Sequence, residues 1–453
     1  MRRHIVIIGG GPAGIEAARA AASAGSLVTL IYKGPFGGRA SWNSLLSSKA
    51  WLTNSEIFYL LRMAPQLKYD HEESAATHAA TAFDRIHKIM RQWIGRQSQL
   101  LHGLDVQLLA GVAQLIDPHT VRATHPELPQ PTTLHADAII IATGSIPRCP
   151  EGMRPDGKLI IAPRIASRLE GIPASVLVIG GGVTASEFAH LFNLLGSSVT
   201  WLIDTQGVLP GFPRAASRAI IDVLTNRGVK IIENQPVPHL DCEDRQVTAL
   251  LADGTRVSAA IAFLAVGRKP DFRHLNLAAV GLQANERGEV AVDGYGRTAI
   301  PSIYMVGDAA GEPMLANRAT AQAWIAGRHA AGRPSAPFRA ETVVHAVYSD
   351  PQIAMVGTID VSDPVMIRIQ LPFTATLKTY LQNEEHGMIE LIYHQQTRCI
   401  LGGVAIGPQA AEVLAPVALA IQAGATIEDL AATAGAHPTF SELAFLAARY
   451  TMQ

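Results

Sequence analysis

The first part of the chain combines a short apolar run, a glycine cluster and an alanine-rich segment. Residues 5–8 are apolar throughout, a pattern typical of a strand that is buried on both faces. The cluster at residues 9–14 reads GGGPAG, and residues 15–21 after it predict a helix. A second strand is expected at residues 28–32. The predicted order is therefore strand, glycine turn, helix and strand.

The glycines in this turn stand where a dinucleotide-binding turn needs them. Gly9 permits the tight turn, Gly11 lets the backbone approach a pyrophosphate, and Gly14 lets the helix pack on the strand. The N-terminus of the helix then faces the anion with its unpaired N–H groups. The segment predicts a dinucleotide site.

The same pattern occurs a second time. A predicted strand at residues 176–179 leads into GGGVTA at residues 180–185, a helix at 186–191 and a strand at 199–203. Two such units imply two dinucleotide sites, and a flavin with a nicotinamide nucleotide is the economical pairing.

Later segments alternate between buried strands and helices. Residues 138–141 and 261–266 are apolar runs, each followed by a turn of small or polar residues. The C-terminal block, residues 336–453, mixes strand patterns such as 388–393 with alanine-rich helices. In the helical stretch at 410–423, Pro416 is expected to kink or restart the helix.

Composition narrows the class of protein. The chain has 453 residues, 48% hydrophobic and 17% charged, which is ordinary for a globular enzyme of two to four domains. A net charge of -1 gives no overall bias toward nucleic acid or an anionic membrane. The apolar run near the start is too short for a signal peptide, and no run reaches the ~18 apolar residues of a membrane span. A cytoplasmic location is expected.

The cysteines also favour a cytoplasmic location. Cys149, Cys242 and Cys399 lie far apart, without metal-like spacing, as scattered thiols in a reducing compartment do. A histidine- and acid-containing stretch at residues 70–81 is expected to be a solvated loop rather than a metal site. No metal is predicted.

Residues 37–49, GGRASWNSLLSSK, carry a family resemblance that lacks the family's two cysteines. They resemble the segment GGTCxNxGCxPSK of the class I pyridine nucleotide-disulfide oxidoreductases, such as dihydrolipoamide dehydrogenase. The matching positions are Gly37, Gly38, Ser48 and Lys49. Ala40 and Leu45 stand where the two redox cysteines should be, and neither side chain can supply a thiolate. Trp42 and Leu45 either fill the vacated space or shape a flat site for an aromatic acceptor.

Other segments match the same family in order along the chain. The segments that look like family signatures are 142–147, 266–270, 303–308, 314–317, 347–351, 401–408 and 437–442. The resemblance implies an α/β fold with two Rossmann-like dinucleotide-binding domains and an α+β C-terminal dimerisation domain. It places the FAD-binding domain in residues 1–149 and 271–335, the NAD(P)-binding domain in 150–270 and the dimerisation domain in 336–453. It also implies a homodimer.

The resemblance assigns four catalytic candidates. Lys49 and Glu187 fall where two side chains pair beside the flavin N5; there the cation stabilises negative charge on reduced flavin and the carboxylate holds it. His437 and Glu442 match an acid–base dyad that the partner subunit supplies. With no thiolate to protonate, this dyad either braces the dimer interface or delivers a proton to a different acceptor.

The resemblance also implies which residues bind the two cofactors. They are Gly9, Gly11, Gly14, Lys49, Ala113, Thr143, Gly144, Asp308, Met314, Leu315, Ala316, Asn317, Gly180, Gly182, Ala185, Glu187 and Gly267. In the family the aspartate at the position of Asp308 accepts hydrogen bonds from the ribityl chain, and Asn317 replaces a histidine beside the isoalloxazine.

Two substitutions bear on cofactor affinity and choice. Tyr32 stands where an acid should grip the adenosine ribose, so FAD is either held less tightly or another group substitutes. In the second unit Ile203 takes that place, with Asp204 next to it, and no lysine or arginine lies between Ile203 and Pro213. This favours NADH over NADPH, although Ala185 favours NADPH by family habit.

Two functions fit these residues. The first is an FAD-dependent NAD(P)H oxidoreductase that passes electrons from reduced flavin to a non-disulfide acceptor: a quinone, a pyridine nucleotide or a redox partner. The alternative is a catalytically degenerate flavoprotein that serves as a binding or regulatory protein. Lys49, Glu187, His437 and Glu442 favour the enzyme, whereas Tyr32, Ile203 and the lost cysteines favour the alternative.

Overall fold

The computed structural model describes residues 2–43, 46–53, 75–125, 127, 130–163, 171–243, 245–384 and 386–450. The chain forms two compact units. The first unit contains Met1–Pro150, Ile161–Gly171 and Val266–Phe338, and the second contains Glu151–Ile160, Ile172–Ala265 and Arg339–Gln453. Each unit is considered by itself below.

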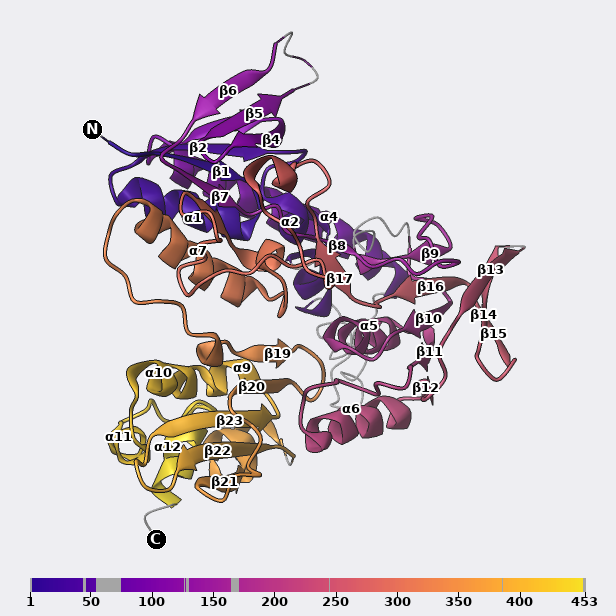
Figure 1. The fold of residues 1–453 in the computed structure, drawn as a ribbon. Coiled ribbons are helices and arrows are strands. Elements are labelled where there is room, and N and C mark those ends of the chain that lie inside the picture. The colour runs from indigo at the N-terminus through magenta and orange to yellow at the C-terminus, as the bar shows by residue number, and fades with distance from the viewer. Residues whose placement is uncertain are drawn as a thin grey trace. The chain divides into compact units, whose positions relative to one another are not determined.

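A five-stranded sheet of order β18-β7-β1-β2-β3 forms the centre of the first unit (Figure 1). Its strands are β1 (His4–Ile8), β2 (Leu27–Tyr32), β3 (Gln107–Ala110), β7 (Ala138–Ile141) and β18 (Ile303–Met305). All neighbouring strands in it are parallel. The central strands β7, β1 and β2 are mostly apolar because both faces of a parallel sheet are covered.

Helices α1 (Pro12–Ser23) and α7 (Ala316–Ala330) pack against each other along this sheet (Figure 1). Small residues make the approach possible: a Cβ at Gly327 would lie 2.6 Å from the carbonyl oxygen of Ala17. Other helical segments of this unit are α2 (Gly38–Asn43), α4 (Ala75–His102) and the 3₁₀ turns η3 (Leu277–Val280) and η4 (Gly307–Ala310).

Two smaller sheets complete the first unit. A three-stranded antiparallel sheet contains β4 (Val112–Asp117), β5 (Thr120–Thr124) and β6 (Thr132–His135). The short strands β8 (Ser145–Pro147) and β17 (Arg268–Pro270) pair antiparallel. The chain leaves the first unit after β8, returns to it for Ile161–Gly171 and returns again at Val266, just before β17. The β8–β17 pair thus joins the segment that first leaves the unit to the one that finally returns.

The second unit contains another sheet, of order β12-β11-β10-β16-β9, in which β12, β11, β10 and β16 pair parallel. Its strands are β9 (Ile160–Ile161), β10 (Ser175–Ile179), β11 (Ser198–Leu202), β12 (Lys230–Ile232) and β16 (Ile261–Leu264). The helices α5 (Val183–Leu194) and α6 (Arg214–Asn226) follow β10 and β11. Phe188 of α5 stacks on Phe263 of β16 at 4.1 Å between ring centroids, which joins helix to sheet. The strands β13 (His239–Glu243), β14 (Gln246–Leu250) and β15 (Arg256–Ala259) form an antiparallel appendage.

The C-terminal part of the second unit is an α+β layer. Its antiparallel sheet has the order β19-β20-β23-β22-β21. The strands are β19 (His345–Val347), β20 (Ile353–Gly357), β21 (Met366–Pro372), β22 (Met388–His394) and β23 (Ile400–Ile406). The helical segments are η5 (Ala340–Thr342), η6 (Phe373–Ala375), α8 (Leu377–Gln382), α9 (Ala410–Val413), α10 (Ala415–Ala423), α11 (Ile427–Ala432) and α12 (Glu442–Tyr450). Helices α9, α10 and α12 contribute apolar side chains to the core on this sheet.

Most local predictions agree with these elements. The strands predicted at residues 28–32 and 388–393 differ from β2 and β22 by one residue at one end, and the strand predicted at 199–203 is shifted by one residue from β11. The helix expected to restart at Pro416 does so, since α9 ends at Val413 and Pro416 lies in the first turn of α10.

One local prediction is wrong. Residues 70–81 were expected to be a solvated loop, but α4 begins at Ala75. The segment from Ala75 is rich in alanine, the residue with the highest helix propensity, and this outweighs its polar character. Residues 70–74 lie outside the described residues. Within the described ranges, no cluster of three or more His, Cys, Asp or Glu side chains could hold a metal ion. A search of the same residues finds no helix long and apolar enough to span a bilayer.

Candidate functional site

The first glycine turn excludes a side chain at Gly9 and Gly14 but is open at Gly11. A Cβ at Gly9 would lie 2.1 Å from the carbonyl oxygen of Ala142, and one at Gly14 would lie 1.7 Å from that of Gly9. By contrast, a Cβ at Gly11 would meet nothing within 4 Å. Gly11 is the N-cap of α1, so the open space lies at the N-terminus of a helix, where a pyrophosphate fits.

The turn after β7 offers a second fitting feature. The hydroxyl oxygen of Thr143 is buried and has no hydrogen-bond partner among the described residues. Gly144, next to it, has a positive φ of 72°, a conformation that glycine adopts without cost. Buried hydroxyls in proteins are almost always hydrogen-bonded, so Thr143 fits a partner supplied by a bound cofactor.

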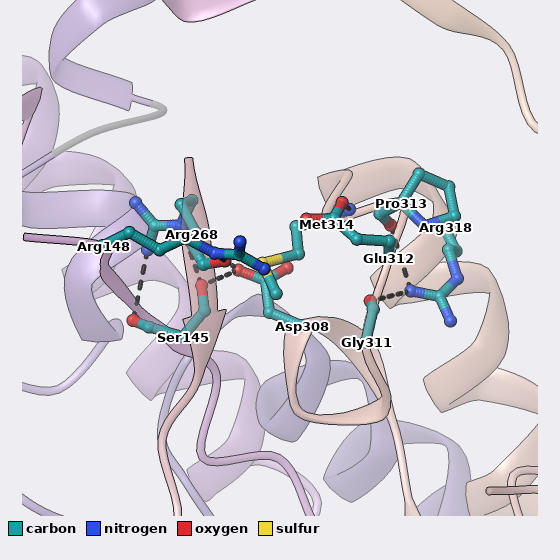
Figure 2. A network of polar contacts seen from close by, with 9 residues as sticks. All are labelled: Ser145, Arg148, Arg268, Asp308, Gly311, Glu312, Pro313, Met314 and Arg318. Atoms are coloured by element: carbon teal, nitrogen blue, oxygen red, sulfur yellow. Dashed lines mark hydrogen bonds and ion pairs between the residues drawn. The ribbon is translucent and has the colours of Figure 1, made fainter. Parts of the chain in front are cut away.

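Asp308 belongs to a chain of polar contacts with the two connecting strands (Figure 2). Its Oδ2 accepts a hydrogen bond from the Ser145 hydroxyl at 2.5 Å. Arg268 in turn donates from Nε to Ser145 Oγ at 2.8 Å and from Nη2 to the Ser145 carbonyl oxygen at 3.2 Å. Burial lowers the pKa of Arg268, and the nearby Asp308 and Glu312 carboxylates oppose that shift.

The turn that follows Asp308 is held by the buried side chain of Arg318 and the exposed one of Glu312. Arg318 donates from Nη1 to the carbonyl oxygens of Gly311, at 2.7 Å, and Pro313, at 3.0 Å (Figure 2). The Glu312 carboxylate accepts from the Met314 N–H at 3.1 Å. Burial lowers the pKa of Arg318, with opposing effects from Asp308 and Glu312. This turn connects Asp308 to the predicted flavin-facing residues Met314, Leu315, Ala316 and Asn317, of which the last two begin α7.

Sequence reasoning did not name Ser145, Arg268 or Arg318 as site residues. Ser145 and Arg268 stand in the two family-like signatures, so their place after buried strands could have marked them. Arg318 had no such signal, because its role depends on carbonyl groups that only the folded turn brings within its reach.

Tyr32 is the last residue of β2, at the strand end where it was predicted. Its ring packs edge-to-face on Phe36, with centroids 5.5 Å apart. A Cβ at Gly10 would lie 2.7 Å from the Cβ of Tyr32, so this side chain borders the first glycine turn. Ala113 lies on β4, 6% exposed, within the apolar core of the unit. Contacts of either residue with a cofactor stay a prediction.

The cysteine-less segment lies directly on the first glycine turn. The Gly37 N–H donates to the Gly10 carbonyl oxygen at 2.9 Å, and a Cβ at Gly38 would lie 2.8 Å from the Cα of Gly11. Ala40 is in α2, which starts at Gly38. Trp42 donates from its indole nitrogen to the Phe36 carbonyl oxygen at 2.7 Å. Leu45 lies outside the described residues, and Lys49 is in the helical stretch 46–53.

The second glycine turn repeats the geometry of the first. A Cβ at Gly182, the N-cap of α5, would meet nothing within 4 Å. Gly180 has a φ of 119°, and its carbonyl oxygen accepts a hydrogen bond from the Trp201 indole at 2.7 Å. Ala185 is fully buried in α5. Gly267, also a candidate, belongs to the first unit and has a φ of 97°.

Glu187 is buried in α5, at 5% exposure. Its Oε1 accepts a hydrogen bond from the Tyr348 backbone N–H at 3.0 Å. Lys49 and Glu187 belong to different units, and their pairing beside a flavin stays a prediction.

His437 and Glu442 are brought together within the second unit. His437 Nδ1 and Glu442 Oε2 are 2.8 Å apart, and the carboxylate also accepts from the Thr439 N–H at 3.4 Å. A carboxylate can only accept, so Nδ1 carries the proton and Nε2 is the nitrogen that can take or give one. The His437 side chain is 60% exposed and that of Glu442 is 12% exposed, so the acid is fixed and the imidazole is accessible.

Two family models together match most of the chain. Residues 3–323 match the pyridine nucleotide-disulphide oxidoreductase family, and residues 343–447 match the dimerisation domain of that family. This confirms the predicted α/β fold with two dinucleotide-binding domains and a C-terminal dimerisation domain, and that domain supports a homodimer.

Individual relatives span nearly the whole chain. An NAD(P)H dehydrogenase (quinone) from Mycobacterium tuberculosis strain H37Rv is 32% identical, over 100% of this chain and 94% of the relative. Dihydrolipoyl dehydrogenase 2 of Haloarcula marismortui is 32% identical, over 98% of this chain and 96% of the relative.

Solved structures agree. The crystal structure of LpdA from Mycobacterium tuberculosis has a TM-score of 0.93 at 31% identity, with both chains covered completely. The HOCl-induced flavoprotein disulfide reductase RclA of Escherichia coli, at 23% identity and a TM-score of 0.83, shares the fold. With its two glycine turns and this full-length similarity, the chain belongs to the pyridine nucleotide-disulphide oxidoreductase family, whose members use FAD and NAD(P)H.

Proposed function

We propose that this protein is an FAD-dependent NAD(P)H oxidoreductase that passes electrons from reduced flavin to a non-disulfide acceptor. The observation that carries the proposal is the placement of Ala40 in α2, against the first glycine turn, where the family has a redox cysteine. The chain's cysteines, Cys149, Cys242 and Cys399, all lie outside residues 37–49. Dithiol–disulfide exchange needs a thiolate beside the flavin, and this segment has none to offer.

FAD, when bound, accepts a hydride from the nicotinamide and releases its two electrons to a second substrate. Lys49 is the cation proposed to stand beside the flavin, and Glu187 is the carboxylate proposed to orient it. The Tyr348 N–H holds that carboxylate in α5 at 3.0 Å. The open spaces beside Gly11 and Gly182 suit the two pyrophosphates.

A quinone is the acceptor that the residues support best. Reduction of a quinone takes two electrons and two protons, so the site needs a proton donor. His437, with Nδ1 held by Glu442, can give a proton from Nε2. The similarity to an NAD(P)H dehydrogenase (quinone) supports the same choice. Pyridine nucleotides and protein redox partners remain the competing acceptors.

The favoured nucleotide is NADH. Ile203 directly follows β11 and is fully buried, and no lysine or arginine lies between it and Pro213 to hold a 2′-phosphate. The domain boundaries inferred above, a cytoplasmic location and the roles of the individual site residues likewise stay proposals.

A colour test separates the enzyme from its alternative, a degenerate flavoprotein that only binds nucleotides. The purified holoprotein is mixed anaerobically with NADH or NADPH, and its flavin absorbance is followed. Bleaching, followed by recovery when a quinone is added, is the expected result. Flavin that both nucleotides leave oxidised would favour the alternative, which the substitution of Tyr32 for the ribose-gripping acid also favours. Rapid turnover of dihydrolipoamide would instead overturn the non-disulfide assignment.

A further inference from the structure

We propose that Ser145 and Arg268 are positioning residues that orient the Asp308 carboxylate for FAD before the cofactor binds. The inference concerns cofactor binding and does not depend on the identity of the electron acceptor. It rests on the order of the contacts in Figure 2, where Ser145 lies between Arg268 and Asp308.

The direction of this hydrogen-bond chain is fixed by chemistry. A guanidinium only donates, so the lone pair of Ser145 Oγ must receive the Arg268 Nε–H. The Ser145 hydroxyl proton cannot point at Arg268 and is directed to Asp308 Oδ2 instead. Arg268 therefore determines which way the serine donates, and the serine determines which carboxylate oxygen is occupied.

Arg268 acts on Asp308 mainly through the serine. Arg268 Nε is 3.9 Å from Asp308 Oδ2, beyond hydrogen-bond distance, whereas it is 2.8 Å from Ser145 Oγ. Ser145 is 1% exposed, so water does not substitute for its hydroxyl. The two residues lie on the paired strands β8 and β17, where Ser145 is opposite Pro270 and Arg268 is opposite Pro147.

The backbone around Arg268 holds it against this serine. Arg148 donates from Nε to the Arg268 carbonyl oxygen at 2.9 Å, and the Arg148 N–H donates to the Gly267 carbonyl oxygen at 3.0 Å. The far side of the Asp308 turn is held independently, because the Gly307 N–H donates to Gln322 Oε1 at 3.0 Å. Ser145 therefore holds the carboxylate, and Gln322 holds the backbone just before Asp308.

A carboxylate set in this way is prepared to accept hydrogen bonds from hydroxyl groups of a cofactor. Pre-organisation increases affinity, because the ordering cost is met during folding rather than during binding. Loss of one hydrogen bond to a charged group then weakens FAD binding by about ten- to a hundredfold.

The test is a double-mutant cycle on FAD affinity. Apoproteins of S145A, R268M and the double variant are titrated with FAD, and the dissociation constant is taken from the change in flavin fluorescence. Each single variant is expected to weaken binding by about ten- to a hundredfold. The double variant is expected to be no weaker than the weaker single variant, because Arg268 acts through Ser145.

Matched controls separate positioning from folding. Ser302 is the serine control: its hydroxyl, in the same unit, donates to the Pro118 carbonyl oxygen at 2.8 Å. S302A should therefore leave FAD affinity unchanged. Arg273 pairs with Asp271 on the surface, so R273M serves as the arginine control. The conservative variant S145T retains the hydroxyl and should recover most of the affinity lost in S145A.

Three outcomes would overturn the proposal. The first is an unchanged dissociation constant in S145A. The second is losses that add in the double variant, which would mean that Arg268 acts on the cofactor by itself. The third is FAD binding in S145T that is as weak as in S145A, together with lower melting temperatures of both apoproteins. That result would give Ser145 a merely structural role. If R268M does not fold, S145A and S145T still decide the outcome.

Discussion

The Tyr348 backbone N–H donates a hydrogen bond to the Glu187 carboxylate at 3.0 Å, across 161 residues of sequence. This contact joins α5, the helix after the second glycine turn, to the residue that follows β19. It holds a buried carboxylate in one orientation, on the helix whose N-terminus is proposed to face the nicotinamide nucleotide. Lys49 is the proposed partner of this carboxylate.

Replacing Glu187 by glutamine or Lys49 by alanine should slow flavin reduction by NADH by roughly ten- to a hundredfold, because a charge placed beside the reacting centre is lost. Anaerobic stopped-flow absorbance measures the rate. K88A, which removes an exposed lysine of α4, is the matched control and should reduce at the native rate. A native rate in both K49A and E187Q would remove these residues from hydride transfer.

His437 is predicted to act in the second half-reaction only. H437Q keeps a hydrogen-bonding side chain opposite Glu442 but cannot shuttle a proton, so reoxidation of reduced flavin by a quinone should slow by about 10²-fold or more. Flavin reduction by NADH should remain at the native rate. H274Q, at an exposed histidine, is the control. The other reading of the dyad, that it only braces the interface, predicts that H437Q dissociates the dimer. Flavin reoxidation would then be normal once a high protein concentration restores the dimer.

The open spaces at the two N-caps predict a matched pair of variants. Gly11 and Gly182 have ordinary φ values of -82° and -78°, and a Cβ at either would meet nothing within 4 Å. G11A and G182A should therefore fold normally, with unchanged apoprotein melting temperatures. G11A should weaken FAD by about tenfold or more, and G182A should do the same for NADH only, because the methyl group enters the proposed anion site. If G11A weakened NADH binding and G182A weakened FAD binding, or if neither variant changed either affinity, the two turns would bind other ligands.

G14A gives the steric contrast. Its Cβ would lie 1.7 Å from the Gly9 carbonyl oxygen, so the apoprotein itself should be destabilised. A melting temperature equal to that of G11A would contradict the packing described for this turn.

His190 predicts acid sensitivity in the second unit. It is 1% exposed, its Nδ1 lies 3.5 Å from Arg227 Nη1, and burial followed by the Arg227 charge lowers its pKa to about 4. Asp350, which binds Arg227, opposes this shift. The imidazole is therefore neutral in the folded protein at neutral pH.

The sign of the effect follows from proton linkage. The unfolded imidazole, with a pKa near 6.5, binds a proton more readily than the folded one, whose pKa is about 4. Stability is thus complete above about pH 6.5 and falls by up to about 3 kcal/mol as the pH drops toward 4. H190Q, whose amide does not titrate, should show a smaller fall in melting temperature between pH 7 and pH 4.5 than the native protein. H274Q, at an exposed histidine, should match the native pH dependence; equal curves for H190Q and native protein would refute the assignment.

Local sterics explain why so much of the fold could be predicted from sequence. The strand, glycine turn and helix of each unit are contiguous, and the turn tolerates no side chain at Gly9 or Gly14 whatever surrounds it. The His437–Glu442 pair was also within reach, since its members are five residues apart. The start of α4 was not, because alanine propensity outweighed a polar composition that suggested a loop.

The sequence by itself determined the two dinucleotide turns, the family and the absence of a thiol pair in residues 37–49, because each of these is a property of neighbouring residues. Only the tertiary structure decided which side chains support the site. Ser145 reaches Asp308 across 163 residues, and Arg268 reaches Ser145 across 123. A hydrogen bond needs its atoms within about 3 Å in the right direction, and only the packing of separate strands and turns sets that geometry.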